Sequence, residues 1–369
     1  MIATRLRLRN FRSYTSADIA LGPGLTVVHG RNGAGKTNLL EGLYFGCTGR
    51  SCRTSNEREV IHFGAQVTRV EVDLRDDEGR EHALTVGFSP GEPKRLQADG
   101  VRVERLVDVQ ARPLICVFLP DRLELVKGPP ALRRSHVDQV VSAMWPGRAA
   151  TRRAYGQALA QRNALLARVR NSRASASSLP AWDAELARHG VALRNDRGAA
   201  VELLAARFAT IAGDLGLGRE AELRYRPRSR AADAAGLAAE LAEHTASDLE
   251  RGFTGHGPHR DDLSFLRSGR ELRSYGSQGE QRLSLLSLLL AEREALAATR
   301  RAVPLMLLDD VMSELDADRR GLLARMLGGD GQSVITTTDL AHVPGAAAPE
   351  VTRLSVVGDG QILQDAVAA

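Results

Sequence analysis

The chain has 369 residues, enough for two or three domains with full hydrophobic cores. Its apolar content of 43% excludes wholesale disorder, and its net charge of +5 with a pI of about 9.4 permits a polyanionic partner. The three cysteines, Cys47, Cys52 and Cys116, lack zinc-site spacing, and their odd number argues against a disulfide framework. The charged N-terminus excludes a signal peptide, and the longest apolar run, residues 283–291, is too short to cross a bilayer. We therefore expect a soluble, cytoplasmic protein without a membrane partner.

The first 121 residues are predicted to be rich in strands. Residues 4–11 alternate apolar and charged side chains, as a half-buried strand does. Similar patterns predict further strands over residues 17–21, 25–28, 70–74, 82–88 and 113–119.

The third of these strands is followed by GRNGAGKT, which matches the P-loop pattern G-x-x-x-x-G-K-T. In a P-loop the backbone N–H groups cradle phosphates, and the lysine reaches the terminal phosphates. A helix predicted over residues 38–45 would point its positive N-terminus at the same anion. The alternative is a plain glycine-rich turn, but the chain has only three lysines, which makes a chance match rare. The predicted nucleotide-binding residues are Gly30, Arg31, Asn32, Gly33, Ala34, Gly35, Lys36, Thr37 and Asn38.

Helical patterns replace strand patterns after residue 130. One predicted helical face carries Tyr155, Leu159, Leu166 and Val169, and another carries Trp182, Leu186, His189 and Leu193. Residues 171–178 predict a flexible turn between these short amphipathic helices, and a strand pattern returns at residues 222–226. Residues 122–218 hold 15 basic and 7 acidic residues. This basic arm is either a surface that contacts a polyanionic partner or simply a solvated helical surface.

An apolar run at residues 304–308 ends in two acids, Asp309 and Asp310. Such a run is typical of a central parallel strand whose acids emerge at the carboxyl end. Asp309 and the Thr37 hydroxyl are predicted to hold Mg²⁺. Asp310 is predicted to be catalytic by orienting or deprotonating the attacking water, and Lys36 is the second predicted catalytic residue. The alternative for Asp309 is a strand-end acid that caps a turn.

A second anion-binding pattern precedes the acidic strand. Ser277, Gln278, Gly279 and Glu280 stand at the start of a predicted helix, where a hydroxyl and a glycine meet the positive helix end. In isolation this pattern indicates only a helix N-cap. After the acidic strand, residues 313–316 open a further helix.

The order of P-loop, Ser-Gln-Gly-Glu signature and acidic strand resembles that of ABC-type ATPases. About 240 residues separate the P-loop from the signature, more than in transport ATPases and fewer than in SMC proteins with their coiled coils. This spacing resembles that of the RecF family. Further resemblances lie at residues 8–12 (LRNFR), residues 125–138 (LVKG, Arg133-Arg134 and Asp138) and residues 254–263 (TGHGPHRDDL). The resemblance implies that Arg12 lies near the nucleotide phosphates.

This resemblance implies an α/β fold, an ABC/SMC-type P-loop ATPase head of two lobes with an inserted helical arm. The predicted domains are an N-terminal ATPase lobe (1–121), the helical arm (122–218) and a C-terminal ATPase lobe (219–369). The resemblance further implies ATP and Mg²⁺ as cofactors and an ATP-dependent homodimer in which Ser277 of one subunit meets the other subunit's ATP. It also implies sequence-independent binding to double-stranded, gapped or junction DNA, weak DNA-stimulated ATPase activity, and cooperation with RecR and RecO in loading RecA.

Several alternatives and gaps accompany this interpretation. A transport ATPase subunit would need a membrane partner, and a purely structural SMC-like tether would need heptads, which the sequence lacks. His256, His259, Asp261 and Asp262 could ligate a metal, although the resemblance gives their segment a structural place. Asp310 stands where transport ATPases carry Glu, which predicts slow hydrolysis. No switch histidine is assigned, since residues 334–339 offer hydroxyls instead, and no Q-loop glutamine stands out near residues 113–120.

DNA contacts are predicted to come from arginines that bind phosphates. Arg152, Arg153 and Arg162 are the arm residues whose reversal would test whether the arm is the contact surface.

Overall fold

The computed structural model describes residues 1–329, 331–358 and 361–364, without the side chains of Glu314 and Gln364. The chain forms two compact units: unit 1 combines residues 1–122 with 296–369, and unit 2 is residues 123–295. The predicted division placed residues 219–295 with the C-terminal lobe, whereas the structure groups them with the helical arm. The reason is strand pairing, because residues 221–226 pair with residues 262–267 and pack on the long helix of the arm.

Unit 1 contains an antiparallel sheet with the order β2-β1-β4-β5-β6-β7. Its strands are β1 (Ile2–Phe11), β2 (Tyr14–Ala20), β4 (Thr68–Arg75), β5 (Glu81–Phe88), β6 (Arg95–Ala98) and β7 (Val101–Arg102). Along β1, Leu6 and Leu8 are fully buried while Arg5 and Arg9 are exposed, as the alternating pattern predicts.

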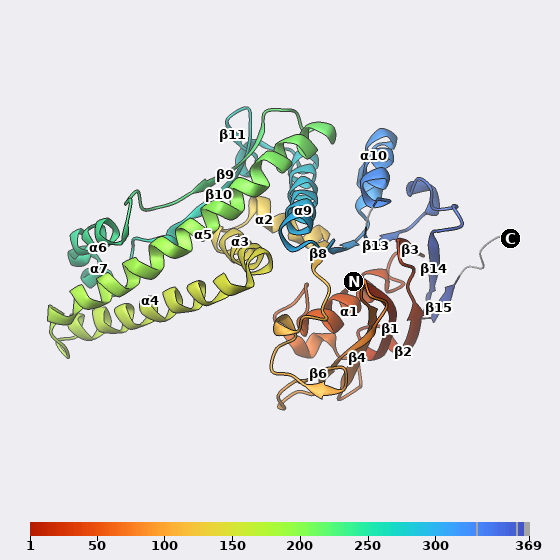
Figure 1. Ribbon diagram of the computed structural model, residues 1–369, viewed down its shortest axis with the longest axis horizontal. Helices are drawn as coiled ribbons and strands as arrows, with labels where there is room; N and C mark the ends of the chain where they lie inside the picture. Colours follow the sequence, from red (N-terminus) through yellow and green to blue (C-terminus); the bar gives the residue numbers. More distant parts are fainter. Residues whose placement is uncertain (330, 359–360, 365–369) are drawn as a thin grey trace. The chain divides into compact units, whose positions relative to one another are not determined.

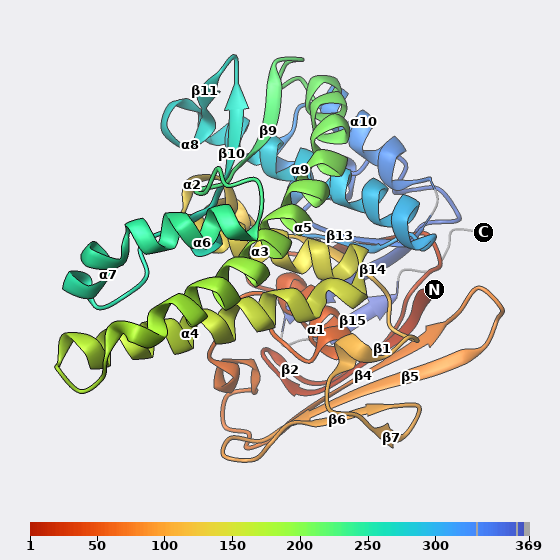
Figure 2. The same cartoon turned by 60° about the vertical axis from the view of Figure 1, so that its left-hand side comes forward.

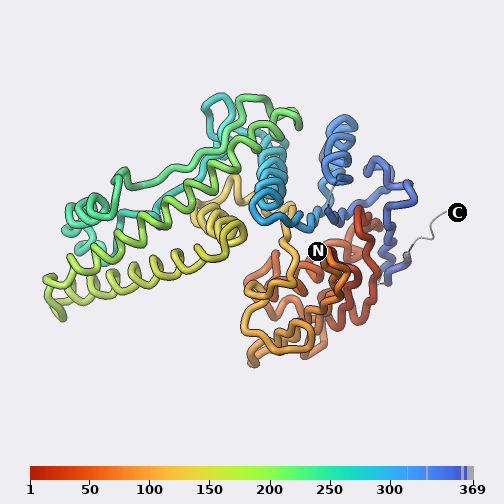
Figure 3. Tube along the Cα trace, in the orientation of Figure 1, coloured from red at the N-terminus to blue at the C-terminus, as the bar shows by residue number. Residues whose placement is uncertain are grey.

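The second sheet of unit 1 has the order β15-β14-β3-β13-β12-β8. Its parallel strands are β3 (Leu25–His29), β8 (Ile115–Phe118), β12 (Leu305–Leu308), β13 (Ser333–Thr337) and β14 (Thr352–Val357), and β15 (Gln361–Gln364) is an antiparallel edge. Strands from both ends of the sequence therefore form one sheet (Figure 3). Because β3 and β12 are parallel with β13 between them, the P-loop and the two acids emerge at the same edge.

Helix α1 (Lys36–Thr48) contacts strands of both sheets and is buried on most sides, so a single core joins the two sheets (Figure 1). Unit 1 also contains α10 (Ala317–Leu327), whose N-cap is Asp316. The Asp316 carboxylate accepts a hydrogen bond from the Arg319 backbone N–H at 2.9 Å, so residues 313–316 do open a helix as predicted.

Unit 2 is built around a helical pair and a small sheet (Figure 2). Its helices are α2 (Glu124–Lys127), α3 (Pro130–Met144), α4 (Ala149–Arg170), α5 (Leu179–Asp214), α6 (Ala234–Glu243), α7 (Thr245–Arg251), α8 (Leu272–Tyr275) and α9 (Gln278–Arg300, whose last residues group with unit 1). The sheet has the order β11-β10-β9, from β9 (Ala221–Arg226), β10 (Asp262–Arg267) and β11 (Arg270–Glu271).

The prediction of short amphipathic helices was wrong for α5, which runs for 36 residues. Gly190 interrupts its apolar pattern but does not end the helix. A Cβ at Gly190 would lie 2.9 Å from a Leu237 methyl group, so the glycine allows α6 to pack closely against α5.

Strand β10 begins only at Asp262, after a loop and a 3-10 turn that carry the first residues of the TGHGPHRDDL segment. Strands β14 and β15 form an antiparallel hairpin. Among the described residues, no helix combines the length and the apolarity needed to span a bilayer.

Candidate nucleotide-binding site

The P-loop lies between β3 and α1, the strand–loop–helix context that the sequence predicted. Gly30 has φ 155°, and a Cβ there would lie 2.3 Å from the Val356 carbonyl oxygen, so only glycine fits. The Lys36 ammonium donates to the carbonyl oxygens of Gly30 (2.8 Å) and Arg31 (3.0 Å), so it lies folded over the loop. Burial lowers the pKa of Lys36, although Asp310 and Asp309 oppose that shift.

The structure brings together the two residues that were predicted to hold Mg²⁺. The Thr37 hydroxyl lies 2.9 Å from Oδ1 and 2.8 Å from Oδ2 of Asp309, and Asp309 is only 6% exposed. A carboxylate and a hydroxyl at the start of a P-loop helix are the oxygen ligands that Mg²⁺ prefers beside nucleotide phosphates. The donor set therefore fits the ion.

A second hydroxyl completes this cluster, and sequence reasoning did not assign it a role. Thr336, at the end of β13, donates to Asp309 Oδ1 at 2.7 Å and accepts from the Asp310 backbone N–H at 2.9 Å. Asp310 itself has a left-handed backbone, with φ 47°. Thr336 thus fixes both acids at the edge of the sheet, and the run of threonines after the apolar residues of β13 was the available signal.

Residues at the turn between β1 and β2 form hydrogen bonds with the end of the P-loop and the first turn of α1. The Tyr14 hydroxyl donates to the Gly35 carbonyl oxygen at 3.0 Å, and the Asn38 amide donates to Ser13 Oγ at 2.9 Å. Burial raises the pKa of Tyr14, which keeps this hydroxyl protonated as a donor. Sequence reasoning missed Ser13 and Tyr14, which follow directly after the predicted strand.

Arg12 was expected near the nucleotide phosphates. Its guanidinium forms two hydrogen bonds with Glu41 of α1, Nε to Oε2 at 2.9 Å and Nη2 to Oε1 at 2.7 Å. Glu41 is fully buried and also contacts Arg53 at 3.3 Å and the Ser51 hydroxyl at 2.5 Å. In this structure Arg12 holds α1 one turn beyond the P-loop, and its contact with phosphate stays a prediction.

The signature residues lie in unit 2, at the start of α9. Ser277 and Glu280 form a reciprocal capping box: the Ser277 backbone N–H donates to Glu280 Oε2 at 2.7 Å, and the Glu280 backbone N–H donates to Ser277 Oγ at 3.3 Å. The hydrogen bond from Ser277 lowers the pKa of Glu280. Ser277, Gln278 and Gly279 are exposed, so the hydroxyl and the helix N-terminus face solvent.

The segment considered as a possible metal site has a structural role. His256 is bonded to Glu240 at 2.7 Å, His259 to Tyr155 at 2.7 Å, and Asp262 forms a two-bond ion pair with Arg133. Within the described residues, no group of three or more histidine, cysteine and acidic side chains has metal-site geometry. These contacts tie the segment to its neighbours within unit 2.

One of the three arm arginines proposed as a test of DNA contact is unsuitable. Arg162 is 0% exposed and lies between Asp183 and Asp248, with both contacts at 2.6 Å. Arg152 is half exposed and approaches Asp138 at 3.2 Å, and Arg153 is exposed. Reversal of Arg162 would disrupt unit 2 rather than report on DNA.

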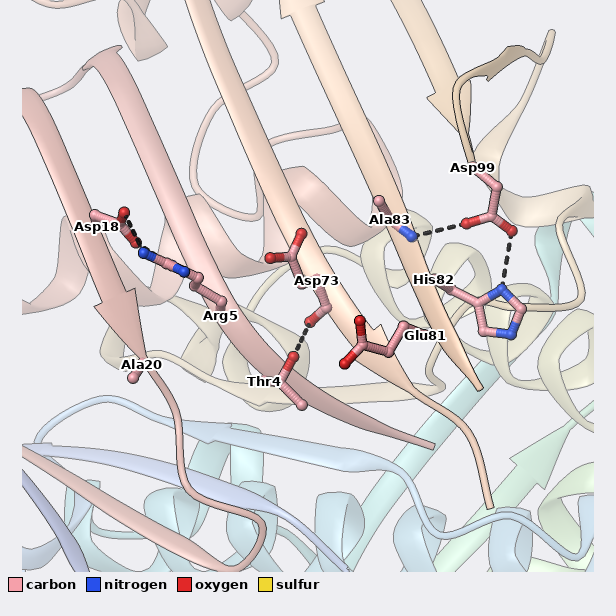
Figure 4. A pocket seen from close by; sticks show the side chains of 9 residues that line it. All are labelled: Thr4, Arg5, Asp18, Ala20, Asp73, Glu81, His82, Ala83 and Asp99. Carbon is pink, nitrogen blue, oxygen red and sulfur yellow. Dashed lines mark hydrogen bonds and ion pairs between the residues drawn. The ribbon is translucent and has the colours of Figure 1, made fainter. Parts of the chain in front are cut away.

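A polar hollow lies on the antiparallel sheet of unit 1, and no P-loop residue lines it (Figure 4). Its charged groups largely pair with each other or with close neighbours: Arg5 binds Asp18 through two hydrogen bonds at 2.5 and 2.7 Å, and His82 lies 2.9 Å from Asp99. The lining residues are Thr4, Arg5, Asp18, Ala20, Asp73, Glu81, His82, Ala83 and Asp99. We assign no ligand to this hollow.

Comparison with known families agrees with this geometry. The family model described as RecF/RecN/SMC N terminal domain matches residues 2–357. The DNA replication and repair protein RecF of Myxococcus xanthus is 38% identical, over 97% of this chain and 96% of the relative. That of Herpetosiphon aurantiacus is 36% identical, over 96% of this chain and 98% of the relative.

The chain belongs to the RecF family. A solved structure of the recombination mediator protein RecF-ATP in the RecFOR pathway matches with a TM-score of 0.87 and 26% identity, covering 99% of this chain and 97% of the other. A solved SMC head bound to the C-terminal winged-helix domain of ScpA matches with a TM-score of 0.58 and 16% identity, which shows a shared fold alone. The predicted α/β head of the ABC/SMC type is therefore confirmed.

Proposed function

We propose that this protein is an ATP-dependent DNA-binding protein of recombinational gap repair and replication restart. The observation that carries the proposal is the contact of Thr37 with Asp309, which joins the P-loop to the acidic strand in a chain of the RecF family. The RecF names and the ATP-bound RecF structure support ATP as the nucleotide and DNA repair as the process.

The residues of unit 1 suggest how ATP would be held. Backbone N–H groups of the P-loop and the Lys36 ammonium would bind the phosphates, once Lys36 leaves the carbonyl oxygens of Gly30 and Arg31. Mg²⁺, held by Thr37 and Asp309, would neutralise charge on the phosphates. Asp310, fixed by Thr336, would orient or deprotonate the attacking water. We propose weak, DNA-stimulated hydrolysis that resets the protein.

The exposed signature favours a two-fold dimer. Ser277, with the exposed N-terminus of α9, is proposed to meet the γ-phosphate bound by a second subunit, which makes ATP a link between two copies. The dimer would clamp duplex or gapped DNA without sequence preference and cooperate with RecR and RecO in loading RecA.

A complementation experiment tests the trans-acting signature. Lys36→Met should lose ATP affinity, while Ser277→Arg should bind ATP as a monomer but fail to dimerise and hydrolyse. In an equal mixture half of the dimers are mixed, each with one intact site, so about a quarter of the parent's DNA-stimulated ATPase activity should return.

The control is Ser277→Ala, which loses the side-chain cap of α9 at a cost of about 1 kcal/mol but introduces no clash. A mixture that stays inactive, or a Ser277→Arg monomer that no longer binds ATP, would contradict the proposed dimer.

A further inference from the structure

The carboxylate of Glu280 lies directly beside the residue that is proposed to meet a second subunit's ATP. It accepts a hydrogen bond from the Ser277 backbone N–H at 2.7 Å. This hydrogen bond and, after it, the contact with Arg267 lower the pKa of Glu280, so the carboxyl is charged at neutral pH. A negative charge there stabilises the N-terminus of α9, but it repels any other anion that approaches the same helix end.

Arg267 of β10 compensates this negative charge. Its guanidinium forms an ion pair with Glu280, in which Nη1 donates to Oε1. The Ser277 backbone N–H binds the other oxygen, Oε2, so one carboxylate joins the strand to the signature turn. With Arg267 in place the pair carries no net charge, and the partial positive charge of the helix end is left to attract a phosphate.

A tight hairpin places Arg267 next to α9. Arg267 is the last residue of β10 and lies opposite Arg270 of β11, and the turn between them is Ser268-Gly269. Both turn residues have positive φ, 49° and 75°, as in the type I′ turns that match the twist of two antiparallel strands. The preceding residue, Leu266, is 1% exposed, so the strand that carries Arg267 is anchored in the core of unit 2.

The fold of the signature turn does not depend on Arg267. Gln281 is 8% exposed, and its side-chain amide donates to the carbonyl oxygens of Leu272 (2.9 Å) and Gly276 (3.3 Å). These bonds hold the turn that leads into Ser277, and the capping box holds Ser277 itself. The Arg267 side chain is 43% exposed, and an ion pair as exposed as this contributes little to stability. Its charge is therefore free to serve binding rather than folding.

We propose that Arg267 is a positioning residue for the nucleotide of the second subunit: by neutralising Glu280, it allows the N-terminus of α9 to accept the γ-phosphate and so sets the affinity of the ATP-dependent dimer. Because a two-fold dimer contains two such ion pairs, each change in charge acts twice. The inference rests on the proposed dimer, and it adds a residue outside the signature whose effect passes through Glu280.

The test measures the dissociation constant of the dimer by analytical ultracentrifugation of the full chain with ATP and Mg²⁺. Arg267→Gln leaves the Glu280 charge uncompensated and should weaken the dimer by about 25-fold, from roughly fivefold at each of the two sites. Glu280→Gln keeps a side chain that can cap α9 and leaves Arg267 uncompensated, so it should tighten the dimer by a similar factor. The double variant again has no net charge and should return to within about threefold of the parent.

The matched control is Arg224→Gln, which breaks an exposed pair with Glu222 on β9 of the same sheet and should leave the dimer unchanged. All variants should bind ATP as monomers with the parent's affinity. The inference is overturned if Arg267→Gln behaves like Arg224→Gln, if it weakens ATP binding by the monomer, or if the double variant stays as weak as Arg267→Gln, which would mean that Arg267 does not act through Glu280. These results refute the inference alone, whereas a parent that does not dimerise with ATP refutes the proposed dimer as well.

Discussion

Asp309 of unit 1 and two buried aspartates of unit 2 are satisfied in different ways. In unit 1, Asp309 accepts hydrogen bonds from the hydroxyls of Thr37 and Thr336 and forms no ion pair with a described basic side chain. In unit 2, the equally buried Asp138 and Asp248 each contact a guanidinium group, at 2.7 and 2.6 Å. The difference separates an acid kept for an incoming cation from acids that hold the fold together.

This contrast has an energetic basis. A buried carboxylate is costly unless a cation compensates it, and arginine compensates it permanently with geometry that fixes both partners. Hydroxyl partners stabilise the carboxylate less than arginine does. They leave room for a positively charged metal ion to bind the same carboxylate. Three experiments test this contrast, given in order of decreasing change in the free energy of unfolding.

Removal of a guanidinium from unit 2 should have the largest effect. Arg162→Met leaves Asp183 and Asp248 buried without a counter-charge, so the free energy of unfolding should fall by about 3–5 kcal/mol. Urea unfolding followed by circular dichroism measures the loss. The control, Arg188→Met, breaks an exposed pair with Glu185 and should change stability by less than about 0.5 kcal/mol. Equal effects for the two variants would mean that the buried arginine does not hold unit 2 together.

A pH titration should reveal a second, smaller dependence in unit 2. Burial lowers the pKa of His259 to about 4 from its ordinary value of 6.5, while its ring contacts the Tyr155 hydroxyl and the Thr254 carbonyl oxygen. Because the folded pKa is depressed, this contribution to stability is complete above pH 6.5 and is lost as the pH falls towards 4. The loss should amount to roughly 2–3 kcal/mol in the free energy of unfolding.

The matched variant for this titration is His259→Gln, which retains a side-chain donor and acceptor but does not titrate. Its free energy of unfolding should vary less than the parent's between pH 6.5 and 4. Parallel curves for the two proteins would refute the assignment of this dependence to His259.

Asp309→Asn should have the smallest effect on stability. Without nucleotide, the variant keeps hydrogen bonds to Thr37 and Thr336, so the free energy of unfolding should change by less than about 1 kcal/mol. The increase in ATP affinity that Mg²⁺ gives the parent should disappear, as isothermal titration with and without Mg²⁺ would show. Strong destabilisation in the absence of nucleotide would place Asp309 with the structural acids of unit 2.

Local pattern was sufficient to predict the P-loop and the acidic strand, because each is a strand followed by functional residues at fixed spacing. It was insufficient for Thr336 and Tyr14, since their contacts depend on which strands are neighbours: β13 lies between β3 and β12, and the β1–β2 turn lies against the P-loop. No periodicity within a single strand encodes the order of strands in a sheet.

The burial of Arg162 could be predicted from the sequence, but its partners could not. Composition suggested a basic, solvated arm, yet residue 162 falls on the predicted apolar face of Tyr155, Leu159, Leu166 and Val169. Its spacing from those residues therefore indicated burial, and a buried arginine requires acidic partners. The partners, Asp183 and Asp248, lie 21 and 86 residues away and could not be identified without the fold.

The strand order of unit 1 also determines when this sheet can form during synthesis. Strand β3 pairs with β13 and β14, both of which lie near the end of the chain. Roughly 300 residues must be translated after β3 before β13 is complete, a delay of about 15–60 s at 5–20 residues per second. Unit 2 is continuous in sequence and leaves the ribosome within this interval. The P-loop strand must therefore remain without its sheet partners on the ribosome, where an unpaired apolar strand is a target for chaperones.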